Sequence, residues 1–230
     1  MVFDPLYFVF LAPALLLSLW ASFKTKSAFN KYSKVRTMNG MTGADAAKVM
    51  LDRAGIHDVE ITRVPGKLTD HYNPMNKTLA LSMAVHGTPS IAAVGVACHE
   101  AGHAIQHAQA YKPMWLRSIL VKPAKFGSML GFYGMMIGLM MSSMQLFMVG
   151  VILFSGLLAF QLVTLPVEFD ASNRAKKLAV EYGIVSAQER SGMDKVLNAA
   201  ALTYVAAAAA SIMQLLYFLM RAGLLGGSRD

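Results

Sequence analysis

The longest uncharged stretch of this sequence runs from Phe126 to Val167 and contains no Asp, Glu, Lys or Arg. About 20 apolar residues are enough for one α-helix to cross the hydrocarbon core of a bilayer, so a single crossing would use only half of this stretch. Its polar cluster is formed by Ser142, Ser143 and Gln145. We therefore expect two membrane spans with a tight turn between them, with bounds of about 126–142 and 146–166.

Two other apolar runs have the length of a membrane span. The runs from Pro5 to Phe23 and from Ala199 to Met220 contain no charged residue, which predicts spans at about 5–23 and 200–220. The whole chain is 55% hydrophobic and only 15% charged, whereas about 25% of the residues of a typical soluble domain are charged. We therefore predict a mainly α, integral membrane helical protein with about four transmembrane helices.

Basic residues gather at the ends of these apolar runs. Asp4 precedes the first run, and a basic group follows it, namely Lys24, Lys26, Lys31, Lys34 and Arg36. Because Lys and Arg are enriched in cytoplasmic loops, residues 24–125 and 167–198 are predicted to be cytoplasmic and both termini to lie outside. This distribution explains the net charge of +8. We expect a multi-pass protein of the cell membrane, in contact with the lipid bilayer and with no nucleic-acid partner.

The cytoplasmic residues have the pattern of a small α+β region. An amphipathic stretch from Thr42 to Gly55 predicts a short helix, and alternating apolar residues predict strands at 59–64 and 78–83. Longer helical segments are predicted at 88–110 and 167–198. We therefore expect a short β-hairpin or sheet packed with helices, within a single domain that covers residues 1–230.

The predicted helix 88–110 contains the segment His99-Glu100-Ala101-Gly102-His103. Residues four apart share a helix face, so His99 and His103 can present two imidazole nitrogens to one metal ion. Glu100 is then placed to take a proton from a water molecule on that metal. We expect Gly102 to leave room for substrate. The spacing predicts a Zn²⁺ site with Glu100 as the catalytic base; the alternative is a pair of ordinary polar histidines on a half-buried helix.

A catalytic zinc site needs a third protein ligand, and two positions compete for that role. His107 lies on nearly the same helix face, but it is about 12 Å along the axis from His99, too far for one ion unless the helix breaks. Glu168 is the first charged residue after the long apolar stretch. Burying a carboxylate at this place costs free energy unless it has a partner such as zinc. We predict His99, His103 and Glu168 as ligands. Asp170 stays open as an alternative ligand or as a residue that orients a histidine.

Several separated motifs occur along the chain: GKLTDHYNP at 66–74, LALS at 79–82, HEAGHAIQHA at 99–108, LPVEFDASNRA at 165–175 and LNAAALTYVAAA at 197–208. Together they resemble the YugP-like membrane zinc metallopeptidases and, more distantly, HtpX and the CAAX prenyl proteases. The resemblance implies a gluzincin-like region with zinc held by His99, His103 and Glu168 and with Glu100 as the base. The HtpX-like pattern Glu-x-x-x-Asp has Ser172 in its last place here, so the residue that orients the ligands is open.

The GKLTDHYNP motif places His71 among the residues of interest. From the resemblance we expect His71 to lie near the substrate cleft, with a catalytic role as an oxyanion stabiliser or a substrate contact. The alternative is a histidine that packs within a turn. The strand near 78–82 is expected to be an edge strand on which an extended peptide lies.

These patterns predict a zinc-dependent membrane endopeptidase that hydrolyses peptide bonds in a peptide or membrane-protein substrate, with its active site facing the cytoplasm. A role in membrane-protein quality control is the expected biological setting. One alternative is a site-2-type intramembrane protease, although no long uncharged run precedes Glu100 in its helix. A second is a non-proteolytic membrane scaffold or chaperone with a metal site, against which the intact Glu100 argues. The natural substrate and the oligomeric state are open.

Overall fold

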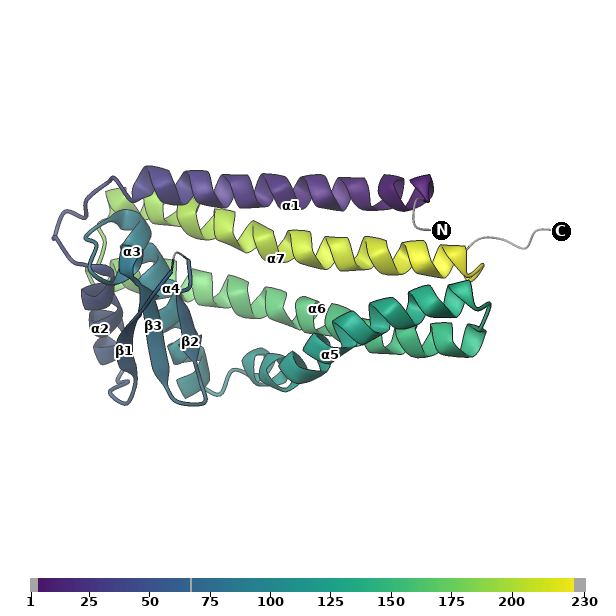
Figure 1. Ribbon diagram of the computed structural model, residues 1–230. Coiled ribbons are helices and arrows are strands. Elements are labelled where there is room, and N and C mark those ends of the chain that lie inside the picture. Colours follow the sequence, from purple (N-terminus) through teal and green to yellow (C-terminus); the bar gives the residue numbers. More distant parts are fainter. Residues whose placement is uncertain (1–3, 67, 226–230) are drawn as a thin grey trace. The chain divides into compact units, whose positions relative to one another are not determined.

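The computed structural model describes residues 4–66 and 68–225, and these residues form a mainly helical chain with a small sheet (Figure 1). The elements, in chain order, are α1 (Pro5–Tyr32), α2 (Gly43–Arg53), β1 (Glu60–Val64), β2 (His71–Asn73), β3 (Thr78–Ser82), α3 (Met83–His86), α4 (Ile91–Ala108), α5 (Lys112–Met140), α6 (Met144–Glu181) and α7 (Ala187–Arg221). This confirms the predicted fold class.

The chain divides into two compact units. The first consists of residues 1–21, 115–165 and 203–230, and the second of residues 22–114 and 166–202. The first unit therefore holds most of the apolar sequence, and the second holds the sheet and the His-Glu-x-x-His segment. The single domain predicted for residues 1–230 covers both units and stays a prediction.

Among the described residues, three helices are long and apolar enough to cross a membrane, namely α1, α6 and α7. We expected about four spans, and α5 is not among the three. The uncharged part of α5 runs only from residue 126 to residue 140. At 1.5 Å per residue it extends about 22 Å, which is shorter than the roughly 30 Å of the hydrocarbon core. A crossing by α5 therefore stays a prediction, in which Lys122 and Lys125 extend their charged ends to the membrane surface.

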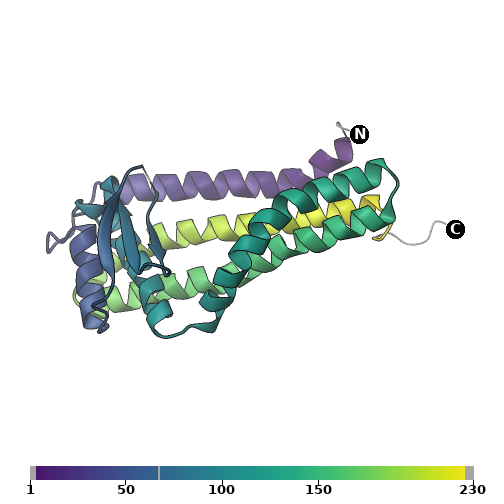
Figure 2. The same cartoon turned by 60° about the horizontal axis from the view of Figure 1, so that its bottom comes forward.

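In the first unit, α5 and α6 form a close antiparallel hairpin whose turn occupies residues 141–143 (Figure 2). Ser142 adopts a positive φ of 53° in this turn. The two helices approach at glycines: a Cβ on Gly131 would lie 2.5 Å from the backbone nitrogen of Phe154, and a Cβ on Gly150 would lie 2.3 Å from that of Met135. Only glycine allows such a backbone approach, which is a common way for membrane helices to pack.

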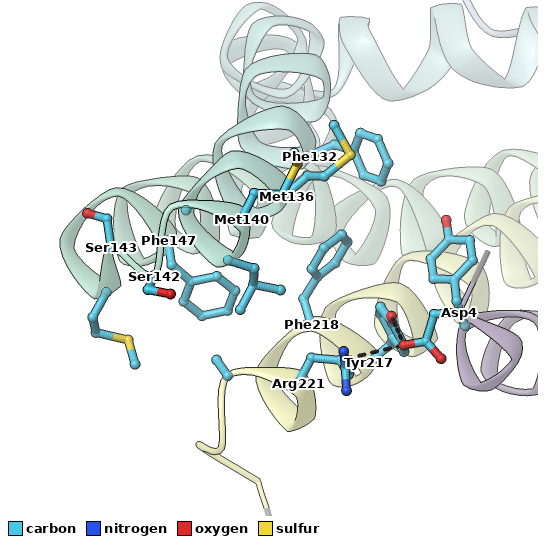
Figure 3. A pocket seen from close by; sticks show the side chains of 15 residues that line it. Asp4, Phe132, Met136, Met140, Ser142, Ser143, Phe147, Tyr217, Phe218 and Arg221 are labelled. Carbon is cyan, nitrogen blue, oxygen red and sulfur yellow. Dashed lines mark hydrogen bonds and ion pairs between the residues drawn. The ribbon is translucent and has the colours of Figure 1, made fainter. Parts of the chain in front are cut away.

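The first unit also contains a cavity of about 600 Å³ (Figure 3). Most of its lining is apolar, including Phe132 and Phe218. Its polar part is a cluster in which the hydroxyl of Tyr217 donates to the Asp4 carboxylate at 2.8 Å and Arg221 pairs with the same carboxylate at 3.2 Å. This cluster joins the start of α1 to the end of α7, and the ion pair neutralises the charge that each residue would otherwise bring to an apolar setting.

The second unit contains a three-stranded sheet with the order β1-β3-β2 (Figure 1). β1 runs parallel to β3, with Glu60 opposite Thr78, and β2 runs antiparallel to β3, with His71 opposite Ala80. β3 is therefore paired on both sides, and the expectation that residues 78–82 form an edge strand is wrong. The turn-rich segment before β3 folds back as β2 and pairs with residues 78–80, so an extended peptide cannot add to β3 along that stretch.

The helix α4 is the centre of the second unit's core. It begins at Ile91, after the side chain of Ser90 caps it by accepting from the backbone nitrogen of Ala93 at 3.2 Å. Most of its side chains are buried, including Val94 and Ala97, against α2 and the sheet. Residues buried all around a short helix hold it in one position, and this rigidity is what a catalytic constellation requires.

Candidate metal centre

His99 and His103 lie on the same face of α4, with ring centroids 4.7 Å apart. Glu168 reaches them from α6: its Oε2 is 3.2 Å from Nε2 of His99 and 3.6 Å from Nε2 of His103. One donor atom from each of the three residues lies within 4.8 Å of the other two. Two imidazoles and one carboxylate are a donor set that zinc accepts, and donors bonded at about 2.0–2.2 Å to one ion must lie this close together.

Gly102 explains how α6 comes so near to α4. A Cβ at this position would lie 2.7 Å from the backbone oxygen of Ala171. The prediction that Gly102 leaves room for substrate is therefore wrong, because the space is filled by the α6 backbone. The same close approach places Glu168, three residues before Ala171, beside the two histidines.

The electrostatics of the cluster favour a bound cation. Burial alone would lower the pKa of His103, but its hydrogen bond with Glu168 and the negative charges of Glu100 and Glu168 outweigh burial, so the pKa is raised. Glu168 lies just beyond the predicted span 146–166 and is only 2% exposed. Burial alone would raise its pKa, but the hydrogen bonds with His103 and His99 lower it well below its usual range. The carboxylate is therefore ionised and available to a metal.

Gln106 determines which nitrogen of His103 faces the cluster. Its Nε2 donates to the backbone oxygen of Val167 at 2.9 Å and to Asp170 at 2.8 Å. Its Oε1 therefore faces Nδ1 of His103, 3.0 Å away, and can only accept. Nδ1 must carry the hydrogen, which leaves the lone pair of Nε2 for a metal. Sequence reasoning missed Gln106; the available signal was its position three residues after His103 on the same helix face.

Ser172 and Asp170 both act on the histidines, one directly and one through Gln106. The Ser172 hydroxyl lies 3.1 Å from Nδ1 of His99, so it accepts from that nitrogen when Nε2 is a ligand. Asp170 forms an ion pair with Arg174, whose Nε lies 2.5 Å from Oδ2 of Asp170. Ser172 stands where the HtpX-like pattern Glu-x-x-x-Asp has its Asp, and its hydroxyl orients His99. Asp170 supports His103 instead, through Gln106.

Glu100 is buried beside the cluster, one position along α4 from His99. Its negative charge contributes to the raised pKa of His103, which places the carboxylate near that ring. Within residues 4–66 and 68–225, no hydrogen bond to the Glu100 side chain is present. Its oxygens can therefore accept a proton from a water molecule, as a general base must.

The two other histidines of interest lie on or beside β2. His71 is exposed, and its Nδ1 is 2.8 Å from the backbone oxygen of Thr69. His107 hydrogen-bonds through Nδ1 with the hydroxyl of Tyr72 at 2.8 Å. The structure groups neither residue with the three candidate ligands in the part of the chain that it describes. His107 thus joins α4 to the sheet.

Cys98, next to His99 in sequence, is fully buried in the core of the second unit. Burial raises the pKa of its thiol to about 12, so the thiolate that binds metals does not form near neutral pH. Cys98 is therefore a packing residue.

These features define a class of protein: a helical chain with membrane-length apolar helices and a rigid, buried cluster of two histidines and one glutamate. Comparison with known proteins narrows the class. Residues 7–223 match a family described as "Putative neutral zinc metallopeptidase". The chain belongs to this family, so its cofactor is zinc, and the donor set fits that metal.

The chain is also similar to "Putative membrane protease YugP" of Bacillus subtilis (strain 168). The two sequences are 47% identical over 214 residues, which cover 93% of this chain and 95% of that protein. This confirms the predicted resemblance. No solved structure matches the chain.

Proposed function

We propose that this protein is a zinc-dependent membrane endopeptidase in which His99, His103 and Glu168 hold the metal. The observation that supports this most directly is the convergence of three donor atoms from two different helices within 4.8 Å. Chance would not bury an ionised carboxylate against two oriented imidazoles, because an isolated charge is costly to remove from water. When bound, zinc lowers the pKa of a water molecule and polarises the substrate carbonyl.

Glu100 is the catalytic base in this proposal. Its carboxylate takes a proton from the attacking water as the water oxygen bonds to the peptide carbon, and it delivers that proton to the nitrogen when the C–N bond breaks. Gln106 and Ser172 keep the two imidazoles in the orientation that points Nε2 at the metal. This division of roles explains why α4 is buried on nearly every side.

His71 is proposed as the oxyanion stabiliser or substrate contact. Its Nδ1 is within hydrogen-bond distance of the Thr69 carbonyl, so Nδ1 carries a hydrogen. The remaining nitrogen, Nε2, donates to a developing oxyanion only when the ring is protonated on both nitrogens. Substitution of His71 by Gln should therefore reduce the rate of peptide cleavage while zinc affinity is unchanged.

The setting we propose is the cytoplasmic face of the cell membrane, with several membrane passes and a peptide or membrane-protein substrate. The basic flanks of the apolar runs support this orientation. α6 supports the location near the bilayer, since it contains both an apolar segment of membrane length and Glu168. Membrane-protein quality control is the biological role that we propose.

The test compares the purified wild type with Glu100→Gln. Both proteins should retain zinc by metal analysis, and only the wild type should cleave casein or an unfolded membrane protein. Loss of the base should lower the rate by about 100-fold or more. Zinc binding without any Glu100-dependent cleavage would favour the scaffold or chaperone alternative. Cleavage of a substrate only within its transmembrane segment would favour the site-2-type alternative, although α4 is not among the described helices that are long and apolar enough to cross a membrane.

The ligand assignment has its own test. Glu168→Ala should lower zinc affinity strongly, because it removes a donor that contacts both histidines. His107→Ala removes a histidine of the same helix as His103 but should leave zinc affinity nearly unchanged. Chelator competition measures both affinities, and the opposite ranking would overturn the choice of Glu168.

A further inference from the structure

A groove of about 520 Å³ lies between α1 and α7 in the second unit, away from the candidate metal centre. One face of α1 lines it with Lys24, Ser27, Ala28, Lys31 and Tyr32. One face of α7 lines the other side with Lys195, Asn198, Ala199 and Leu202. The lining thus carries three ammonium groups and no carboxylate, together with hydroxyl and amide groups that can donate hydrogen bonds. This combination is suited to an anion.

The two helices are joined at this groove. The Thr25 hydroxyl donates to the backbone oxygen of Ala199 at 2.9 Å. Ala28 and Ala199, which have small side chains, also line the groove. Lys24 and Lys31 are seven residues apart, so they lie about 10 Å apart along the α1 axis. The groove is therefore open in its middle and bordered by positive charge at both ends of its α1 side.

Neighbouring residues keep the groove positive. Lys176 donates to Oδ1 of Asn198 at 2.6 Å, which turns the amide NH₂ of Asn198 away from Lys176 and adds a fourth ammonium group nearby. The Lys31 ammonium lies 5.6 Å from the ring centroid of Tyr32, where a cation–π contact holds it. Asp194, the residue before Lys195, pairs with Arg190 at 3.8 Å, so its charge is partly compensated.

The groove lies where both helices pass from apolar to charged sequence. Lys24 is the first charged residue after the apolar run that ends at Phe23, and Ala199 opens the apolar run of α7. At this level of a membrane protein the surrounding anions are the phosphates of phospholipid headgroups, and basic pockets between helices bind such headgroups. Ala28 and Leu202 add apolar contact for the glycerol and the first carbons of the acyl chains.

We propose that this groove is a binding site for the headgroup phosphate of an anionic phospholipid. The lysine ammoniums bind the phosphate, and the amide of Asn198 donates a hydrogen bond to it. The site is separate from the proposed zinc site, because among the described residues the lining of the groove and the group His99, His103 and Glu168 have no member in common. It would hold the segments that follow the first span and precede the last at the surface of the bilayer.

The test uses the full chain in detergent and a short-chain phosphatidylglycerol as the probe, with binding measured by native mass spectrometry. The double variant Lys31→Gln/Lys195→Gln should bind about 25-fold more weakly, given about fivefold for each lysine near an anionic surface. The matched control Lys26→Gln/Lys34→Gln removes the same charge from exposed residues that do not line the groove, and it should weaken binding clearly less than the groove variant does. Equal weakening of both variants, or of neither, would overturn the proposal.

Two further experiments test whether the ligand is an anionic phospholipid and whether it binds in this groove. Short-chain phosphatidylcholine should bind more weakly than phosphatidylglycerol, and inorganic phosphate or glycerol 3-phosphate at the same concentration should not displace the lipid. Displacement by these soluble anions would show a free-phosphate site and contradict the lipid assignment. Ala28→Leu fills the groove without a change of charge and should also weaken lipid binding; unchanged binding would show that the lipid sits elsewhere.

Discussion

At the scale of single residues, Gln106 has the most definite role outside the three candidate ligands. Its amide is completely buried, and both ends of the amide are hydrogen-bonded. An amide that donates twice from nitrogen has no freedom to rotate, so it fixes the ring orientation of His103. Ser172 does the same for His99 with one hydroxyl.

Gln106→Leu keeps the approximate volume of the side chain but removes the acceptor for Nδ1 of His103. Zinc affinity should fall by about 10- to 100-fold, the usual effect of losing a group that orients a ligand. Gln109→Leu is the matched control, because Gln109 is exposed and contacts only Arg174 in this network. Chelator competition on the two variants measures the difference, and equal affinities would show that Gln106 does not position His103.

At the scale of elements, the contact between α4 and α6 decides whether the donors meet. The two helices are adjacent at Gly102 and Ala171, where there is no space for a side chain. α4 alone carries two donors, and the third arrives only because the backbones pack this closely. Zinc affinity should thus depend on helix packing as well as on the ligands.

Gly102→Ala should therefore weaken zinc binding and destabilise the protein by about 1–3 kcal/mol, because the new methyl group collides with backbone that cannot move aside. Gly95→Ala is the control on the same helix: its Cβ would meet the flexible side chain of Met193 at 3.2 Å. Thermal unfolding and zinc titration distinguish the two. A Gly102→Ala protein with wild-type zinc affinity would contradict the close contact.

The start of α2 offers a pH-dependent prediction. Thr42 and Asp45 form a capping box, in which the Thr42 backbone nitrogen donates to the Asp45 carboxylate at 3.0 Å and the Asp45 backbone nitrogen donates to the Thr42 hydroxyl at 3.2 Å. The hydrogen bonds from Thr42 lower the pKa of Asp45. A lowered pKa in the folded state stabilises the fold above the unfolded pKa, and this contribution disappears as the pH falls through the folded value.

Thr42→Ala should thus lower the free energy of unfolding by about 1 kcal/mol at pH 7. The difference from the wild type should begin to shrink as the pH falls below about 4, the usual pKa of an aspartate, and it should disappear as the pH falls through the lowered pKa of Asp45 in the folded protein. Unfolding followed by circular dichroism over a pH series measures this difference in the free energy of unfolding. A difference that stays constant down to the lowest pH would show that the Asp45 carboxylate takes no part in the cap.

At the scale of the whole molecule, the distribution of basic residues predicts the membrane topology. Cys98 is buried and its thiol has a raised pKa of about 12, so it should not react with maleimides. Single cysteines introduced elsewhere can then report on exposure. Met75 in the β2–β3 turn is 92% exposed, and Met141 in the α5–α6 turn is 69% exposed.

In intact cells, Met141→Cys should react with a membrane-impermeant maleimide. Met75→Cys should react only after the membrane is permeabilised. The wild type, with Cys98 alone, should stay unlabelled and serves as the control. The reverse labelling pattern would place the candidate metal centre on the outer side and contradict the proposed cytoplasmic orientation.

The sequence by itself was sufficient for features that depend on neighbours along the chain. The apolar runs predicted α1, α6 and α7 as membrane-length helices, because helix formation and bilayer crossing depend on local composition. The spacing of His99 and His103 predicted that they share a face, because the helical repeat places residues four apart together. Glu168 was predicted from the cost of a carboxylate at the end of an apolar stretch.

Only the tertiary structure decided the features that depend on residues far apart in the chain. The contact of Gly102 with Ala171 is invisible in sequence, since glycine in a helix has several uses. The roles of Gln106 and Ser172, the central position of β3 and the groove between α1 and α7 were decided in the same way. Each of them arises where two separate segments pack together, and no local pattern encodes which surfaces meet.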